Sequence, residues 1–186
     1  MSPARKLPEF LRPAESGALL RAATDPRDAL LLLCGLGAGL RVAEITHLRI
    51  EDVDLAGGTI FVRQGKGAKD RYIPCPAFLL QALAAWIGER QTGWVFPGRK
   101  AGKPLTTRAV EYIVERLKDD AELVRRVHPH CLRHSYATGL LNAGADIMQV
   151  RDLLGHSSVA TTQVYLSVCS DRLRATVDRL ELPGAK

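Results

Sequence analysis

The chain has 186 residues, of which 46% are apolar and 25% charged, a composition typical of one globular domain with a hydrophobic core. This composition excludes a disordered low-complexity chain, and the longest apolar run, 29–40, is too short before Arg41 to span a bilayer. The net charge of +6 and the pI near 9.4 favour a polyanionic partner, although solvated surface charges alone give the same balance.

Periodic apolar residues and turn-forming residues divide the first half of the chain into short elements. The predicted elements are helices near 19–23 and 29–36, a short helix over 42–48, a turn region over 51–58, and strands over 59–62 and 71–73. Asp25 and Pro26 separate the first two helices. The two strands are joined by the sequence GKGAK, so Lys66 is expected in a hairpin loop.

The second half is predicted to be mainly helical. The predicted elements are a helix over 77–89, a third short strand over 94–96, a helix over 107–118, a helix that starts near 132, a helix from 147 to 154, a short helix that carries Tyr165, and a last helix with an apolar stripe at Leu173, Val177 and Leu180. Pro129 is expected to break the chain before its helix. Asp146 and Gln149 have the spacing of a capping box, and Gly155 is a predicted C-cap. The predicted fold class is α+β, mainly α-helical, with a small three-stranded antiparallel sheet.

The cysteines and the N-terminal sequence indicate the cellular compartment of the protein. The four cysteines are scattered without CxxC spacing, which is typical of reduced thiols in the cytosol. The first ten residues, MSPARKLPEF, contain no apolar signal region. We therefore expect a cytoplasmic protein with no membrane association.

Basic residues gather in three segments of the sequence. They are Arg63, Lys66, Lys69 and Arg71, then Arg99, Lys100, Lys103 and Arg108, and finally Arg125 and Arg126. Of these, Lys69 on the hairpin and Arg108 at the start of its helix are the predicted DNA contacts.

The most informative stretch runs from His128 to Tyr165 and reads HPHCLRHSYATGLLNAGADIMQVRDLLGHSSVATTQVY. In it His130 and Arg133 are three residues apart, His156 follows 23 residues after Arg133, and Tyr165 follows nine residues later. Two further segments precede it: GLGAGLRVAEITHLRIEDVDL contains Arg41, and GKGAKDRYIPC contains Lys66. Together these residue types predict a phosphoryl-transfer site.

The three motifs, in this order and spacing, resemble the catalytic domain of tyrosine recombinases, the Xer and phage integrase family. Carried over position by position, the resemblance implies six catalytic residues: Arg41, Lys66, His130, Arg133, His156 and Tyr165. It also implies residues 9–186 as the catalytic domain, residues 1–8 as a tail or linker remnant, and no N-terminal core-binding domain.

The chemistry that the resemblance implies suits these residue types. Attack of Tyr165 on a DNA phosphodiester adds negative charge to the phosphate oxygens, which Arg41 and Arg133 can bind through paired hydrogen bonds. His130 is the candidate base, His156 a hydrogen-bond donor to the phosphate, and Lys66 the candidate acid for the leaving 5′ oxygen. The product is a 3′-phosphotyrosyl link, and no cofactor is implied. The implied partners are double-stranded DNA and other protomers, with a monomer free in solution and a tetrameric synapse on DNA.

Other interpretations use the same residues differently. In one interpretation Arg41 pairs with Glu44 on a helix surface and has no catalytic role. In the family interpretation the same glutamate orients the arginine. A topoisomerase IB-like nicking and resealing activity keeps the chemistry, whereas a non-catalytic DNA-binding accessory protein keeps only the binding groove. The cluster His128, His130, Cys131 and His134 suggests a metal site, but structural zinc takes four ligands and no second ligand pair has suitable spacing, so no metal is predicted. The target DNA sequence and the direction of recombination stay open.

Overall fold

The computed structural model describes residues 9–63 and 70–155. Four of the predicted site residues, Lys66, Lys69, His156 and Tyr165, lie outside this range, as does the predicted last helix. The described elements, in chain order, are α1 (Pro13–Ala22), α2 (Pro26–Ala38), α3 (Val42–Thr46), the 3-10 turn η1 (Ile50–Asp52), β1 (Val53–Asp54), β2 (Thr59–Val62), β3 (Arg71–Pro74), α4 (Ala77–Ile87), α5 (Thr107–Asp120), α6 (Pro129–Ala143) and α7 (Ile147–Leu154).

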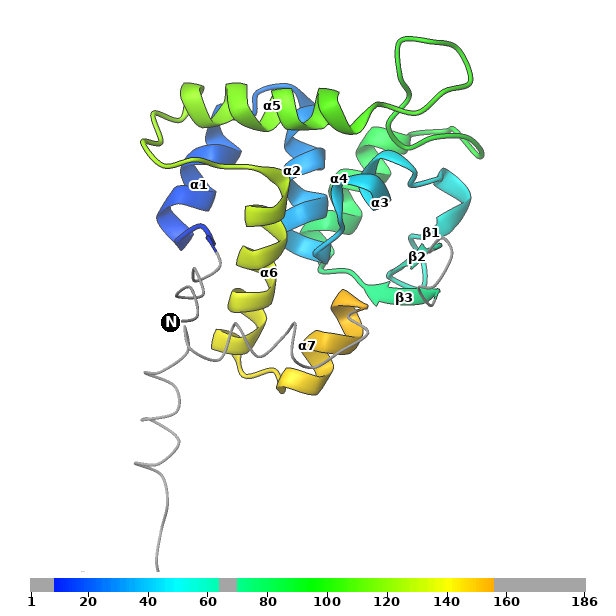
Figure 1. Cartoon of the computed structure of the whole chain (residues 1–186). Coiled ribbons are helices and arrows are strands. Elements are labelled where there is room, and N and C mark those ends of the chain that lie inside the picture. The colour runs from blue at the N-terminus through cyan, green and yellow to red at the C-terminus, as the bar shows by residue number, and fades with distance from the viewer. Residues whose placement is uncertain (1–8, 64–69, 156–186) are drawn as a thin grey trace, which may run out of the picture.

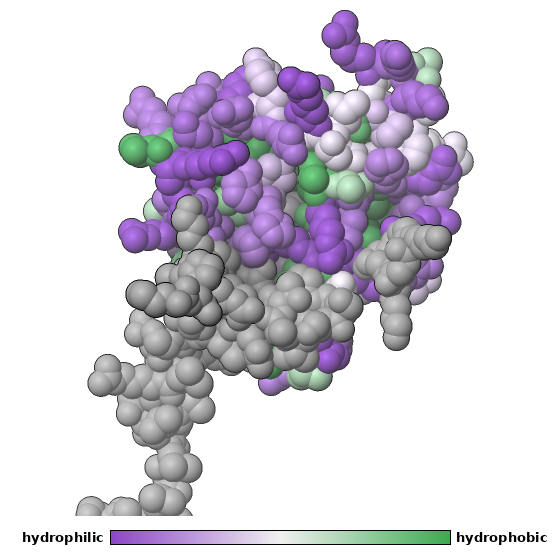
Figure 2. Space-filling model, in the orientation of Figure 1, coloured by the Kyte–Doolittle hydropathy of each residue, from purple (hydrophilic) through white to green (hydrophobic). Residues whose placement is uncertain are grey.

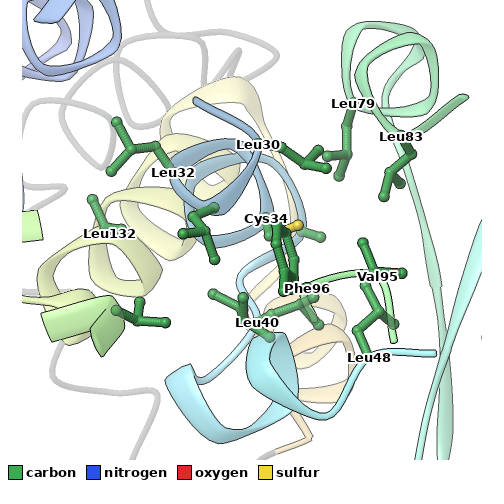
Figure 3. Packing of buried hydrophobic residues seen from close by; sticks show 14 of the residues in the cluster. Leu30, Leu32, Cys34, Leu40, Leu48, Leu79, Leu83, Val95, Phe96 and Leu132 are labelled. Carbon is green, nitrogen blue, oxygen red and sulfur yellow. The ribbon is translucent and has the colours of Figure 1, made fainter. Parts of the chain in front are cut away.

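Helix α2 is the centre of the fold. It packs against α6 on one side and α4 on another, while α5 lies across one end of the molecule and α7 lies at the far end of α6 (Figure 1). Figure 3 shows Leu30, Leu32 and Cys34 of α2 among apolar side chains from the neighbouring elements, including Leu79 and Leu132. Burial of this apolar surface supplies the main driving force for folding.

The small sheet is antiparallel and has the strand order β1-β2-β3, which confirms the predicted fold class. Ile60 pairs with Ile73, and Val62 pairs with Arg71, so all four side chains face the interior side of the sheet. The side of the sheet that faces the core therefore includes one charged residue, Arg71, whose partners are described below.

The third strand was predicted in the wrong place. It is β1, within the region expected to be a turn, whereas Trp94 forms only an isolated bridge with Arg49. Residues 94–96 are apolar because this connection passes through the core, where Val95 and Phe96 are fully buried. A short apolar run is compatible with either a strand or a buried connection, and hydrophobicity alone does not separate them.

The start of α6 also differs from the prediction. The helix begins at Pro129 with His128 as its N-cap, not near Leu132. Proline fits the first helical position because the backbone N–H that it lacks would have no acceptor within the helix there, and because its φ is already helical. His130 and Arg133 consequently both lie inside the first turns of one helix.

Two helix ends direct the chain toward the site. The predicted capping box of Asp146 and Gln149 and the predicted C-cap Gly155 of α7 are both confirmed. Helix α2 ends at Gly39, whose φ of 62° suits glycine, and Arg41 follows as the N-cap of α3. A Cβ atom at position 39 would lie 2.4 Å from the Tyr136 ring, so glycine is required there for packing as well.

The surface of the described residues is mostly hydrophilic on the face shown in Figure 2, with apolar residues in small separate patches. No helix within residues 9–63 and 70–155 is long and apolar enough to cross a membrane.

Candidate active site

Three arginines from three different elements surround one carboxylate, that of Glu44. Arg41 donates to Glu44 through its backbone N–H at 2.9 Å and through Nη1 at 2.7 Å. Arg71 donates to both carboxylate oxygens, at 3.0 and 2.9 Å, and Arg133 Nη1 lies 3.8 Å from Oε2. The predicted pairing of Arg41 with Glu44 is therefore confirmed, and it belongs to a larger cluster of net positive charge.

The same three arginines hold the C-terminal end of α7. Each donates to one of three consecutive backbone carbonyls: Arg71 to Leu153, Arg133 to Leu154, and Arg41 to Gly155. Carbonyls in the last turn of a helix have no partner within the helix and carry partial negative charge, so guanidinium groups stabilise them. The position of the chain just before His156 is fixed by these bonds.

Arg41 and Arg133 differ in accessibility. The Arg133 side chain is only 1% exposed, and its two terminal nitrogens donate to the Gly39 and Leu154 carbonyls. The Arg41 side chain is 38% exposed. Arg41 thus presents its guanidinium to solvent beside a buried positive charge, which is an arrangement suited to an incoming anion.

His130 lies beside these arginines, one turn before Arg133 on α6. Desolvation of its ring lowers the pKa of His130, and the charges of Arg133, His128 and Arg41 lower it further. A lowered pKa keeps the imidazole neutral near pH 7, the form that can accept a proton. The ring also meets that of His134 edge to face at 4.2 Å between centroids.

The histidine and cysteine cluster is arranged differently from the metal site considered above. Within the described residues, the ligand atoms of His128 and Cys131 come within 4.8 Å of one another and of Glu9, whereas His130 and His134 contact each other. Burial raises the pKa of the Cys131 thiol. Three ligands also fall short of the four that structural zinc takes.

The structure thus brings together Arg41, His130 and Arg133 of the six predicted catalytic residues. Lys66, His156 and Tyr165 lie outside the described residues, as does the predicted DNA contact Lys69. The other predicted DNA contact, Arg108, is exposed in the first turn of α5.

Arg71 was missed as a site residue. It was assigned only to a strand and to a basic cluster, but it is buried and makes three hydrogen bonds within the site. The signal that could have found it is its place in the strand, since a charged residue at the position that alternates inward needs a buried partner.

A shallow apolar groove lies near the site, between α2, α4 and α6. Its lining includes Leu36, Phe78, Tyr136 and Leu140, and Phe78 is 53% exposed. Large apolar side chains that remain exposed in a groove are common at surfaces that bind other proteins.

A mainly helical domain with a three-stranded antiparallel sheet and an arginine cluster at a helix end defines the structural class of this chain. Residues 9–172 match the model of the phage integrase family. The chain belongs to that family.

Named relatives give the same assignment. The tyrosine recombinase XerA of Thermococcus kodakarensis is 41% identical over an alignment that covers 96% of this chain and 64% of the relative. The crystal structure of a XerA recombinase superposes with a TM-score of 0.82 at 32% identity, covering 95% of this chain and 67% of that one. A XerH site-specific recombinase, solved bound to palindromic difH substrate after cleavage, gives a TM-score of 0.78 at 30% identity over 96% of this chain and 55% of that one. The chain therefore spans a little under two thirds of the length of the XerA relative.

Proposed function

We propose that this chain is the catalytic domain, residues 9–186, of a site-specific DNA recombinase that cleaves and rejoins double-stranded DNA. The observation that carries the proposal is the arginine cluster at the end of α7, in which Arg41 and Arg133 lie beside His130, whose pKa is lowered by desolvation and by the neighbouring charges. Its similarity to recombinases, one of which was solved with its cleaved DNA substrate, supports double-stranded DNA as the partner. The reduced cysteines and the DNA substrate are consistent with action in the cytoplasm.

The proposed reaction is a transesterification at phosphorus. The Tyr165 hydroxyl oxygen forms a bond to phosphorus, the bond to the 5′ oxygen breaks, and a 3′-phosphotyrosyl link results. His130 takes the proton from Tyr165, and Lys66 gives a proton to the leaving 5′ oxygen. Since one phosphoester replaces another, attack by a 5′ hydroxyl reverses the step and no nucleoside triphosphate is consumed.

The arginines act on the charge of the transition state. Arg41 and Arg133 stabilise the negative charge that grows on the nonbridging phosphate oxygens, Arg41 from an accessible position and Arg133 from a buried one. His156 adds a further hydrogen-bond donor. Both arginines are already held by Glu44 and by backbone carbonyls, so little reorganisation is needed when the phosphate arrives. Loss of one such donor typically lowers the rate by about 10²–10³-fold.

The test is covalent trapping on a nicked suicide substrate. The DNA carries the native recombination site or, where that is unknown, pooled genomic fragments, and the parent is compared with Tyr165→Phe on a denaturing gel. We expect a 3′ adduct with the parent and none with the variant. A DNA shift by both proteins with no adduct from either would overturn the proposal and favour the non-catalytic accessory protein.

The alternative of a topoisomerase IB-like enzyme shares the adduct and differs in the product. Relaxation of supercoiled DNA without joined recombinants would favour it over recombination. The apolar groove beside the site favours recombination, because a recombinase must also bind neighbouring protomers.

Assembly on DNA is the second part of the proposal. We propose a protein that is monomeric when free and tetrameric in the synapse, with the apolar stripe Leu173, Val177 and Leu180 bound in the groove of a neighbouring protomer. Val177→Asp and Phe78→Asp should each abolish recombination while preserving adduct formation on a single site. Normal recombination by both variants would rule out this contact.

A further inference from the structure

Arg71 is a buried residue whose guanidinium donates three hydrogen bonds within the candidate site. Its side chain is 8% exposed, and it lies opposite Val62 on the inward side of the sheet. Nη1 and Nη2 bind the two oxygens of Glu44, and Nε binds the Leu153 carbonyl at 2.9 Å. A buried charge is costly unless it is paired and hydrogen-bonded. An apolar side chain at position 71 would fill the core without this desolvation penalty, so packing alone does not explain an arginine there.

The bonds of Arg71 join three elements that are distant in sequence. Arg71 belongs to β3, Glu44 lies 27 residues away in α3, and Leu153 lies 82 residues away in α7. Arg71 therefore connects the sheet both to the element that carries Arg41 and to the helix end that Arg41 and Arg133 also hold.

Glu44 is shared oxygen by oxygen between two arginines. Oε1 accepts from Arg71 Nη1 and Arg41 Nη1, at 3.0 and 2.7 Å, and Oε2 accepts from Arg71 Nη2 and the Arg41 backbone N–H, both at 2.9 Å. The bidentate bond fixes the plane of the carboxylate, and the carboxylate in turn fixes the guanidinium of Arg41. The charge of Arg71 also balances that of Glu44, which leaves the charge of Arg41 available to an anion.

We infer that Arg71 is a positioning residue of the strand-cleavage site, which acts by clamping Glu44 and the end of α7 so that Arg41 is held ready for the phosphate. This inference rests on the proposed function for its effect on cleavage. Arg71 does not touch the DNA in this scheme, and its effect passes through Glu44.

The protonation state of Glu44 follows from the same contacts. Burial by itself raises the pKa of Glu44, but hydrogen bonds and charge from Arg71, followed by hydrogen bonds from Arg41, outweigh it and the pKa is lowered. Within residues 9–63 and 70–155, Arg133 is the third basic group that forms an ion pair with this carboxylate, at 3.8 Å. When Arg71 is removed, burial remains while the largest opposing contribution to the pKa of Glu44 is lost, so Glu44 takes up a proton at higher pH. The neutral carboxyl group then accepts more weakly from Arg41 than the carboxylate does.

The experiment measures single-turnover cleavage of the suicide substrate at saturating DNA between pH 5 and pH 9 for the parent, Arg71→Lys and Arg71→Met. Arg63→Met is the matched control, because Arg63 directly follows β2 of the same sheet but binds Asp52 and is 64% exposed. We expect Arg71→Met to cleave about 10²-fold more slowly than the parent, with partial recovery in Arg71→Lys and no change in Arg63→Met. The loss should deepen as the pH falls.

Two further measurements separate positioning from misfolding. The double variant Glu44→Gln, Arg71→Met removes the Arg71 charge together with the carboxylate that it binds, while the glutamine side-chain oxygen can still accept from Arg41. It should therefore fold better than Arg71→Met, and it should lose the added acid dependence because no carboxylate remains to titrate. A carbon-13 carboxyl titration of Glu44, without DNA, should show a higher pKa in Arg71→Met than in the parent.

The outcomes are distinct. Cleavage by Arg71→Met at the parental rate and with the parental pH profile would overturn the inference, as would an equal loss in Arg63→Met. An unchanged titration of Glu44 would do the same. If the parent forms no adduct while the Glu44 titration moves as expected, the clamp stands and the proposed function fails.

Discussion

Glu44 is the counterion of three guanidinium groups, and its side chain is 9% exposed. We expect Glu44→Ala to lower the free energy of unfolding by about 3–5 kcal/mol, because the variant leaves buried positive charges without their partner. Urea denaturation measures the effect. Glu111→Ala, at an exposed position on α5, is the control and should stay within about 0.5 kcal/mol of the parent. Equal stability of the two variants would contradict the role of Glu44.

The pKa of His130 predicts the acid side of the cleavage profile. Desolvation and the charges of Arg133, His128 and Arg41 lower this pKa. The imidazole is therefore mostly neutral at a pH equal to the ordinary histidine pKa of about 6.5. Cleavage at pH 6.5 should therefore exceed half of its maximal rate, and the rate should decline as the pH falls through the lowered pKa. A single-turnover pH series checks this, with His130→Gln expected to be about 10²–10⁴-fold slower. A half-maximal rate at or above pH 6.5 in the parent would argue against His130 as the base.

At the residue scale, sequence motifs predicted which side chains meet but not all of the contacts that orient them. The resemblance of three motifs to the tyrosine recombinase family predicted Arg41, His130 and Arg133 as site residues. The pairing of Arg41 with Glu44 was predicted from their separation of three residues on a helix. The contacts of Arg71 depend on the register of β3 with β2 and on where α7 ends. These are tertiary properties, and no local pattern around residue 71 encodes them.

At the scale of an element, the end of α2 sets the position of Arg41. Gly39→Ala should destabilise the protein through a left-handed backbone, at about 1–2 kcal/mol, and through overlap with the Tyr136 ring, at about 1–3 kcal/mol. Thermal unfolding measures the sum. Gly102→Ala is the matched control, since Gly102 also has a positive φ but has no atom within 4 Å of the added carbon. A larger loss of stability in Gly102→Ala would show that the Tyr136 contact adds nothing.

Element boundaries were predictable where capping residues mark them. The ends of α7 follow directly from Asp146, Gln149 and Gly155. The start of α6 was misplaced because proline stops a helix in its interior but favours the first position, and the sequence contains both possibilities at Pro129. The strand β1 has two residues, too few for any periodicity to appear.

For the molecule as a whole, the net charge of +6 predicts binding carried mainly by phosphate contacts. The affinity for duplex DNA should fall steeply with salt, by about 10³-fold between 50 and 200 mM salt if six phosphates are contacted. Fluorescence anisotropy over this range of salt measures the affinity. Arg108→Gln should reduce the slope of log K against log salt by about 0.9 if Arg108 binds one phosphate. Arg21→Gln, exposed on α1, is the control with the same charge change and should leave the slope unchanged. An affinity that hardly varies with salt would refute the prediction.

The whole fold class was predictable because the hydrophobic pattern and the motif order are properties of long segments. A mainly helical domain with a three-stranded antiparallel sheet was expected and is confirmed, although the third strand lies at β1. The arrangement of α7 across the end of the arginine cluster was not predicted, since it depends on how α6, α7 and β3 pack together.

The hydrogen bonds from three arginines to the carbonyls at the end of α7 also bear on the order in which parts of the protein fold during synthesis. The carbonyl that Arg41 binds lies 114 residues later in the sequence. The carbonyls that Arg71 and Arg133 bind lie 82 and 21 residues later. Contacts of such long range form late, after the local helices. A ribosome-bound fragment that ends before α7 therefore contains Arg41, Arg71 and Arg133 but lacks the three backbone carbonyls that these arginines bind.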